Sequence, residues 1–339
     1  MKAAIISKPH GDFEIVERPI PTPGPGQVVL KTKACGICQG DSIVKDNHWH
    51  LPYPRVPGHE IIGAVHQAGP GVEAPFSTVG KVFGVGWAGA SCGSCANCAG
   101  GRRDQCRMHI MTGINFDGGL SEYVLVHASA LVEIPDGMDA AETAPLLCAG
   151  ITVFGALRKN GILPGSIVGI QGLGGLGSIG VSMARSMGFR TVGISTSDSK
   201  RDLAFSFGAE AFVNTSGDGA VEKIMAATGG HGLDAVIATA PSAAAVEALL
   251  PGLAFGGVVV VVAALDRNLS LNPGLMLKNN LRIVFQTAGA AHENAENVRF
   301  AKAFGIKPLV ERFPLERVGE AYDRMITNKV RFRSVVVFE

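Results

Sequence analysis

Residues 167–177 read IVGIQGLGGLG, and this stretch decides the fold. The apolar run 167–171 predicts a buried strand, and the spacing GxGxxG follows it directly, ahead of a helical pattern over 178–187. In that context the first glycine makes a tight turn, the second lets the backbone approach a pyrophosphate, and the third permits close helix packing. The N-terminus of the helix supplies N–H groups and a positive dipole to the phosphates. The predicted dinucleotide contacts are Gly172, Gly174, Gly175, Leu176 and Gly177.

From this stretch onward, short apolar strands alternate with helical patterns. The expected strands are residues 167–171, 191–194, 211–213, 234–238 and 258–263, and the expected helices are residues 178–187, 201–207, 221–227 and 243–250. Buried strands that alternate with helices predict a parallel sheet covered on both faces, which is a doubly wound α/β fold.

The first part of the chain has a different texture. Short β-type runs at 3–6, 28–32, 61–66, 82–85 and 123–126 are broken by Pro and Gly, which indicates a mostly β domain. A helix near 293–304 and a strand at 334–338 are expected to return to it. We therefore predict a mostly β domain of residues 1–150 and 288–339 and a dinucleotide-binding domain of residues 151–287. A cleft between two domains is the default place for a site.

Composition excludes several functions. The 339 residues carry 30 basic against 29 acidic side chains, so no basic surface is available for a nucleic acid or an anionic membrane. The longest apolar stretch, near 258–265, is less than half of the roughly 20 residues that a membrane helix needs. The start shows no signal-peptide pattern, so we expect a cytoplasmic protein with a small-molecule substrate. In a reducing compartment the seven cysteines favour metal binding over disulfides.

Four of these cysteines share one loop. Cys92, Cys95, Cys98 and Cys106 have the spacing CxxCxxCx7C, which suits a closed tetrahedral zinc site. An iron-sulfur cluster is the main alternative, but its common run has a last spacing of three and a following Pro, whereas Arg107 follows here. The loop therefore predicts a structural zinc.

A second set of possible ligands is spread along the chain: Cys35, Cys38, His59 with Glu60, and Cys148. Three N or S ligands from distant segments, with a fourth position left for water or substrate, form a catalytic zinc site. The spacing alone leaves two alternatives, because Cys35 and Cys38 could form a redox pair and Cys148 could be an ordinary buried cysteine.

The second strand of the dinucleotide domain ends without an acid. An enzyme that uses NAD places Asp or Glu there to hold the ribose 2′-hydroxyl. This chain has Ser195-Thr196-Ser197, followed by Lys200 and Arg201, while Asp198 is expected to point to solvent. Hydroxyls and cations suit a 2′-phosphate, so we predict NADP(H) in preference to NAD(H).

Several motifs together resemble one family. Cys38-x-x-Asp41, Gly58-His59-Glu60, the four-cysteine loop, residues 148–152 (CAGIT) and the glycine turn occur in the order and spacing of the zinc-containing medium-chain alcohol dehydrogenases. The likeness covers essentially the whole chain and is nearest to the bacterial, cinnamyl-alcohol-dehydrogenase-like, NADP-dependent branch. It implies a GroES-like catalytic domain beside a Rossmann domain, two zinc ions per chain, a homodimer or homotetramer, and an alcohol, aldehyde or ketone as substrate.

The resemblance also implies roles for single residues. Cys38, His59 and Cys148 become the ligands of the catalytic zinc, which leaves Cys35 as a packed thiol. The further implied residues are Asp41 as the partner of His59, Glu60 beside the zinc, Thr152 beside the nicotinamide, and Arg333 at the pyrophosphate. Trp87 either lines the substrate pocket or is an ordinary core aromatic.

The chain departs from the family where a proton must move. The family usually has Ser or Thr two residues after the first zinc cysteine and often a His three residues further on, but this chain has Gly40 and Ile43. A water chain, the cofactor ribose or His48 is then left to carry the proton. The missing side chains also suggest a wider pocket near the metal.

Three other functions compete with this one. A non-catalytic relative is expected to lack one of Cys38, His59 and Cys148, and a zinc-free quinone reductase lacks both cysteine sets. A thiol oxidoreductase that uses Cys35 and Cys38 would lose activity on Cys35→Ser.

Overall fold

The chain folds into two compact units in the computed structural model, which describes residues 1–108, 110–327 and 329–339. Unit 1 consists of Met1–Ile151 and Ala288–Glu339, and unit 2 consists of Thr152–Thr287. The chain enters unit 2 through helix α4, which spans Ala149–Lys159.

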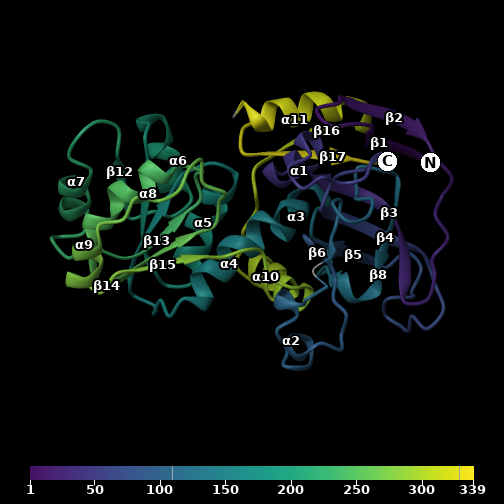
Figure 1. Cartoon of the computed structure of the whole chain (residues 1–339), viewed down its shortest axis with the longest axis horizontal. Coiled ribbons are helices and arrows are strands. Elements are labelled where there is room, and N and C mark those ends of the chain that lie inside the picture. Colours follow the sequence, from purple (N-terminus) through teal and green to yellow (C-terminus); the bar gives the residue numbers. More distant parts are fainter. Residues whose placement is uncertain (109, 328) are drawn as a thin grey trace. The chain divides into compact units, whose positions relative to one another are not determined.

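Unit 2 is built on a six-stranded parallel sheet with the order β12-β11-β10-β13-β14-β15 (Figure 1). Its strands are β10 (Ile167–Gln171), β11 (Arg190–Ser195), β12 (Ala211–Asn214), β13 (Leu233–Ala238), β14 (Leu253–Val261) and β15 (Arg282–Phe285). Its other helices are α5 (Gly175–Ser186), α6 (Arg201–Ser206), α7 (Ala220–Ala227), α8 (Ala243–Leu249) and α9 (Pro273–Lys278). The strand order reverses direction between β10 and β13, and ligands bind at such a switch point in doubly wound sheets. The predicted doubly wound fold is confirmed.

The buried strands of unit 2 explain why the sequence reads as it does. Every residue of β10 is buried, and the core also contains Val192, Ile194, Val236 and Val259 from neighbouring strands. Strands that are covered on both faces need continuous apolar runs rather than alternation. Strand β14 begins at Leu253, five residues before the expected start. The expected start was too late because the apolar run is interrupted at Phe255, which is exposed, and at Gly256, which has a φ of +78°.

Unit 1 contains a seven-stranded sheet with the order β16-β17-β3-β4-β5-β9, to which β8 adds by pairing with β3. Its strands are β3 (Gln27–Gly36), β4 (Glu60–Ala68), β5 (Val82–Val85), β8 (Tyr123–His127), β9 (Val132–Glu133), β16 (Val310–Phe313) and β17 (Arg333–Val337). Smaller pairs are β1 (Lys2–Ile6) with β2 (Phe13–Glu17), and β6 (Ala88–Ala90) with β7 (Ile110–Met111). The helices are α1 (Ser42–Asp46), α2 (Ala96–Ala99), α3 (Ala140–Thr143), α10 (Ala291–Ala303) and α11 (Val318–Ile326).

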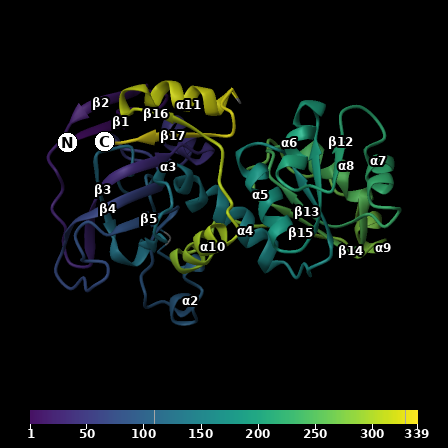
Figure 2. The ribbon, with the colours of Figure 1, turned by 180° about the vertical axis from the view of Figure 1, so that it is seen from behind.

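The end of the chain completes the sheet of unit 1. Strand β17 pairs antiparallel with β3, with Val335 opposite Gly36 and Val336 opposite Cys35. This pairing brings Arg333 to the segment that carries the first cysteines. Both termini lie in unit 1, as the front and back views show (Figures 1 and 2). Buried Leu30, Ile61 and Phe83 lie in the core of this unit.

Among the described residues, no single helix has the length and apolar character to cross a membrane. Ala140–Leu147 and Ala149–Lys159 pass that test only as a pair, which is bent by 48° at its break.

Candidate metal and cofactor sites

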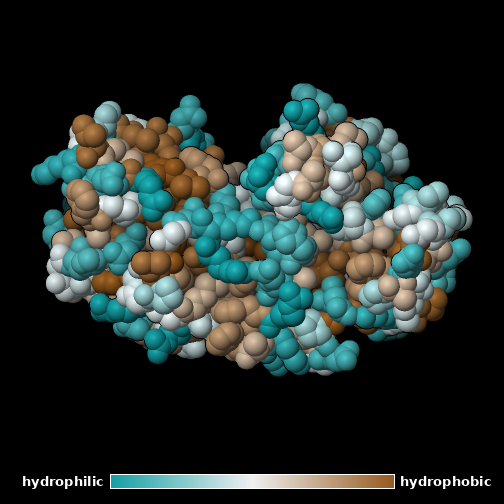
Figure 3. Space-filling view, turned by 90° about the horizontal axis from the view of Figure 1, so that it is seen from below, coloured by the Kyte–Doolittle hydropathy of each residue, from teal (hydrophilic) through white to brown (hydrophobic). Residues whose placement is uncertain are grey.

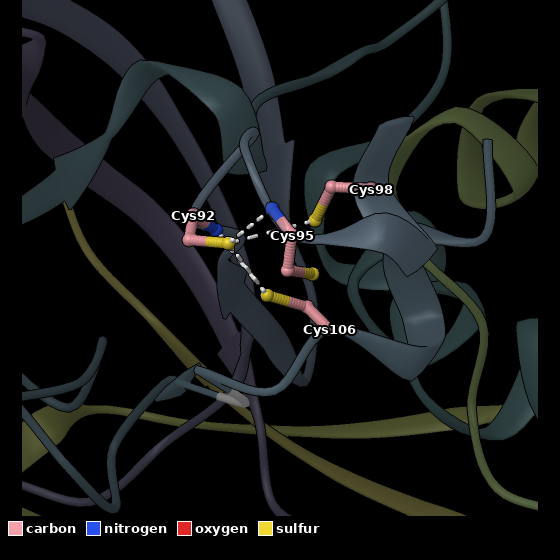
Figure 4. A group of neighbouring side chains, drawn as sticks. All are labelled: Cys92, Cys95, Cys98 and Cys106. Carbon is pink, nitrogen blue, oxygen red and sulfur yellow. Dashed lines mark hydrogen bonds between the residues drawn. The ribbon is translucent and has the colours of Figure 1, made fainter. Parts of the chain in front are cut away.

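The four-cysteine loop brings its sulfur atoms together in unit 1 (Figure 4). All four lie within 4.8 Å of one another, with Cys92 Sγ 3.9 Å from Cys98 Sγ and 3.5 Å from Cys106 Sγ. The cysteines are free, so these are contacts between thiols and not disulfide bonds. Zinc–sulfur bonds of about 2.3 Å at tetrahedral angles separate two sulfurs by about 3.8 Å. The loop therefore fits a tetrahedral ion with four sulfur ligands.

Backbone N–H groups prepare this loop for a cation. The N–H of Cys95 donates to Cys92 Sγ, and the N–H of Cys92 donates to Cys106 Sγ, each at 3.3 Å. The first of these contacts is the main reason why the pKa of Cys92 falls to about 6, whereas burial raises the pKa of Cys98 to about 12. A bound cation would remove this difference between the two pKa values, because metal ligation requires both side chains to be thiolates.

The second cluster joins Cys38, His59, Glu60 and Cys148, whose ligand atoms also lie within 4.8 Å of one another. Cys38 follows β3, His59 directly precedes β4, and Cys148 directly precedes α4, so three separate segments meet here. Cys38 Sγ lies 3.8 Å from Cys148 Sγ, again the separation that two zinc-bound sulfurs have. Hydrogen bonding from Cys148 holds the pKa of Cys38 well below its usual range.

His59 provides the test of whether a metal fits. Its side chain is fully buried, and Nδ1 lies 3.2 Å from Asp41 Oδ1. Both ring nitrogens are buried, and neither makes a hydrogen bond to the described residues, although Asp41 approaches Nδ1 closely. Burying a polar nitrogen without a partner is costly, and a metal ion beside two sulfurs removes that cost. Asp41 is itself fixed, because its carboxylate accepts from the N–H groups of Cys38 (2.9 Å) and Gly58 (3.1 Å).

Glu60 and Arg333 form a buried ion pair beside these ligands. Burial raises the pKa of Glu60 to about 7, although the charge of Arg333 opposes that rise. Glu60 Oε2 has no hydrogen-bond partner in the described part of the chain. The structure thus places Arg333 against Glu60, and its contact with a pyrophosphate stays a prediction.

Trp87 occupies the space that Gly40 leaves open. A Cβ atom on Gly40 would lie 2.9 Å from Trp87 Cζ3 and 3.0 Å from His59 Cε1. The indole meets the His59 ring edge-on, with centroids 4.8 Å apart, and Ile43 packs in the same small cluster as Trp87. The indole therefore stands where a side chain at position 40 would be, and the expected wider pocket stays a prediction.

The remaining thiol and the loop histidine differ in their surroundings. Cys35 is fully buried, burial raises its pKa well above the ordinary value, and its Sγ donates to Gly36 O. The thiol of Cys38 contacts that of Cys148. The side chain of His48 is 60% exposed and lies 3.6 Å from Asp46.

The glycine turn after β10 has the geometry of a phosphate cradle. Gly172 has a φ of +88°, and a Cβ on Gly177 would lie 1.8 Å from Gly172 O, so both positions require glycine. Thr239 Oγ1 fixes the turn by donating to Gly172 O at 2.7 Å. Gly174 precedes α5 and has no heavy atom within 4 Å of the place of a Cβ, which leaves open space at the positive end of this helix.

The end of β11 presents the predicted hydroxyls. Thr196 and Ser197 are exposed and Ser195 is half-buried, while Lys200 ends a short 3₁₀ turn over Asp198–Lys200. Asp198 is exposed as expected, but it is paired with Arg201 at 2.8 Å and accepts from Asn214 at 2.7 Å. Sequence reasoning missed Asn214, because its approach to Asp198 depends on the register between β11 and β12. Thr152 is buried in the first turns of α4.

Known proteins share these features. Residues 24–136 match the alcohol dehydrogenase GroES-like domain family, and residues 175–303 match the zinc-binding dehydrogenase family. Alcohol dehydrogenase notN of Aspergillus sp. (strain MF297-2) is 37% identical over 338 residues, which cover 100% of this chain and 98% of that protein. An alcohol dehydrogenase of Geobacillus stearothermophilus is 33% identical, over 99% of each chain. A solved cinnamyl alcohol dehydrogenase of Sorghum bicolor is 29% identical with a TM-score of 0.88, over 99% of this chain and 97% of that one.

With two side-chain clusters that could each hold a metal ion and a doubly wound unit, the chain falls in the class of zinc-binding dehydrogenases. It belongs to the zinc-containing medium-chain alcohol dehydrogenases, of the cinnamyl-alcohol-dehydrogenase-like type. The predicted GroES-like and Rossmann-type folds are confirmed.

Proposed function

We propose that the chain is a zinc-dependent alcohol dehydrogenase and aldehyde reductase that transfers a hydride between NADP(H) and a primary or secondary alcohol or its carbonyl compound. One observation carries the proposal: Cys38 and Cys148 lie 3.8 Å apart, beside a buried His59 Nε2 without a hydrogen-bond partner in the described residues. Two thiolates and an imidazole form an open catalytic site, in which a fourth position remains for substrate.

The residues of this site divide the work. Cys38, His59 and Cys148 would hold a zinc ion, which would supply the Lewis acidity that polarises a substrate oxygen. Asp41, whose Oδ1 lies 3.2 Å from His59 Nδ1, would orient the imidazole from that side so that Nε2 is the ligand atom. Arg333 balances the buried charge of Glu60. Neither Gly40 nor Ile43 has a group that can carry a proton, so we assign proton transfer to water or to the cofactor ribose.

The four-cysteine loop has a different role in this proposal. Cys92, Cys95, Cys98 and Cys106 supply four sulfurs and leave no position for a substrate, which is the property of a structural zinc site. Two zinc ions per chain follow.

The choice between NADP(H) and NAD(H) rests on the end of β11. The turn after β10 would hold the pyrophosphate through Gly172, Gly174, Gly175, Leu176 and Gly177. Ser195, Thr196, Ser197 and Lys200 would then face the ribose, where three hydroxyls and a cation favour a 2′-phosphate. We place Thr152 beside the nicotinamide and keep Arg333 as a pyrophosphate contact on the resemblance alone. Initial rates decide this point, since a kcat/KM for NADH equal to that for NADPH contradicts it.

We further propose a homodimer or a homotetramer. Strand β15 is an edge strand of the sheet in unit 2, and Phe255, Leu277 and Phe285 of this unit are 78%, 86% and 64% exposed. Brown apolar patches also interrupt the teal surface on the face drawn in Figure 3. Exposed apolar side chains beside an open strand edge favour association with a second copy. Sedimentation equilibrium tests this, because a monomer at micromolar concentration contradicts it.

The function is tested by a screen and a metal analysis on the same sample. NADPH consumption is measured with linear, aromatic and branched aldehydes and with ketones. The proposal expects turnover with at least one of these classes and about two zinc ions per chain. It also expects loss of turnover in Cys148→Ser and near-normal turnover in Cys35→Ser. A thiol oxidoreductase that uses Cys35 and Cys38 would instead lose activity in Cys35→Ser.

A further inference from the structure

The acid that follows the carboxyl end of β11, Asp198, is held on the side of this strand on which β12 lies. Asp198 stands three residues beyond the last residue of β11, Ser195. A carboxylate at this point either holds the two ribose hydroxyls of NAD or repels a 2′-phosphate. Its direction therefore matters for the choice of cofactor.

The partners of Asp198 come from β12 and from the start of α6. Asn214, the last residue of β12, donates its side-chain N–H to Asp198 Oδ2 at 2.7 Å. The amide of Asn214 has a fixed orientation, because its Oδ1 accepts from the N–H of Ser216 at 2.8 Å. Arg201 donates to Asp198 Oδ1 at 2.8 Å, and its guanidinium lies over the ring of Phe212, a β12 residue, at 4.8 Å.

The order of the strands gives this contact its meaning. Strand β11 lies between β10 and β12, and Ser195 pairs with Asn214 in the β11–β12 ladder. The glycine turn follows β10, so the nucleotide site lies on the opposite side of β11 from Asn214. Neighbouring strands are about 4.8 Å apart, which puts the Asn214 end of β12 about 10 Å from β10. Asp198 is thus drawn away from the turn, and its charge is matched by Arg201.

We infer that Asn214 and Arg201 form a clamp that holds Asp198 away from the ribose, and that this clamp determines specificity for the 2′-phosphate. The inference rests on the proposed NADP(H) preference. Arg201 acts here as a positioning residue, because its guanidinium is engaged by Asp198 and Phe212. The competing role is a direct contact between Arg201 and the phosphate, and the two roles predict different results.

A double-mutant cycle on the full-length protein separates them. Calorimetry measures the binding of adenosine 2′,5′-bisphosphate and of adenosine 5′-monophosphate, so the readout needs neither zinc nor turnover. Arg201→Met removes one of the two partners of Asp198 and the cation that matches its charge. This variant is expected to bind the bisphosphate about 10-fold more weakly, while its affinity for the monophosphate changes by less than about 2-fold. Adding Asp198→Asn to this variant is expected to restore the bisphosphate to within about 3-fold of wild type, because the released negative charge is gone.

A matched control uses another exposed pair of unit 2. Arg185 lies 3.1 Å from Glu210, which directly precedes β12 and so lies at the amino end of this strand, whereas Asn214 lies at its carboxyl end. Arg185→Met removes the same charge and should leave both affinities within about 2-fold of wild type. Asn214→Leu gives a second release of Asp198, whose effect Asp198→Asn should also reverse.

The outcomes distinguish the two claims. A double variant as weak as Arg201→Met shows that Arg201 binds the phosphate itself and overturns the clamp. A wild-type protein that binds the two probes equally contradicts the NADP(H) preference instead. In that case the coupling between positions 198 and 201 can still be measured from the wild type, the two single variants and the double variant.

Discussion

Replacing Gly40 by alanine tests how tightly the wall of the candidate catalytic site is packed. The new Cβ would lie 2.9 Å from Trp87 Cζ3 and 3.0 Å from His59 Cε1, whereas carbon atoms normally approach to about 3.5–4.0 Å. Both neighbours are rings held by packing, so the strain has no flexible side chain to absorb it. Overpacking of this kind costs about 1–3 kcal/mol. For a unit of this size the melting temperature should fall by about 2–12 °C.

The assay is thermal unfolding of the zinc-loaded protein, with zinc content measured on the same samples. Gly319→Ala is the matched control, because Gly319 lies in α11 with no heavy atom within 4 Å of the place of a Cβ. That exchange should stabilise the protein slightly, since alanine is the better helix former. In a Trp87→Leu background, Gly40→Ala should cost less, because the contact with Trp87 at 2.9 Å is gone and only the one with His59 at 3.0 Å remains. The reasoning is refuted if Gly40→Ala melts with wild type, or if it costs the same in both backgrounds.

Three further predictions concern the ligands and the proton. Asp41→Asn should weaken zinc binding at the Cys38 site about 10- to 100-fold, because His59 loses the partner that orients it, and chelator competition measures this; unchanged affinity would exclude the role. The pKa of Cys92 is lowered to about 6, so below that pH its thiol must lose a proton before it can bind zinc. In a Cys148→Ser background, the logarithm of the zinc affinity of the four-cysteine loop should therefore fall with decreasing pH by about one extra proton in slope below pH 6. An equal slope on both sides would contradict that value. His48→Ala should leave the pH dependence of kcat/KM unchanged, since His48 is exposed beside Asp46, and a shifted profile would make it part of the proton route.

Local features of the chain were predictable from sequence. Strand β10 spans the residues expected for it, Ile167–Gln171, because its signal is a continuous apolar run bounded by the glycine turn. Strand β15 was missed, since an edge strand with half-exposed residues lacks such a run. Helix α11 was also missed, although buried Val318, Ala321 and Tyr322 have helical spacing. Its nine residues were too few for the pattern to stand out.

The candidate site also has features that could be predicted from the sequence and others that could not. The four-cysteine set could be predicted from its close spacing in one loop. The set of Cys38, His59 and Cys148 came from the resemblance to a family, because its spacing alone left a redox pair and an ordinary buried cysteine open. The place of Trp87 against Gly40 could not, because 47 residues separate them and their contact depends on tertiary packing. The contact of Arg333 with Glu60 likewise depends on the pairing of β17 with β3.

The most direct test of the account is X-ray absorption at the zinc edge of the purified protein. Four thiolates at one site, and two thiolates with one imidazole and one oxygen at the other, predict about two zinc ions per chain with an average of about three sulfur ligands each. Cys148→Ser should reduce the zinc content toward about one and raise the average toward about four sulfurs. A wild-type protein with one zinc and four sulfurs would contradict a metal at Cys38, His59 and Cys148.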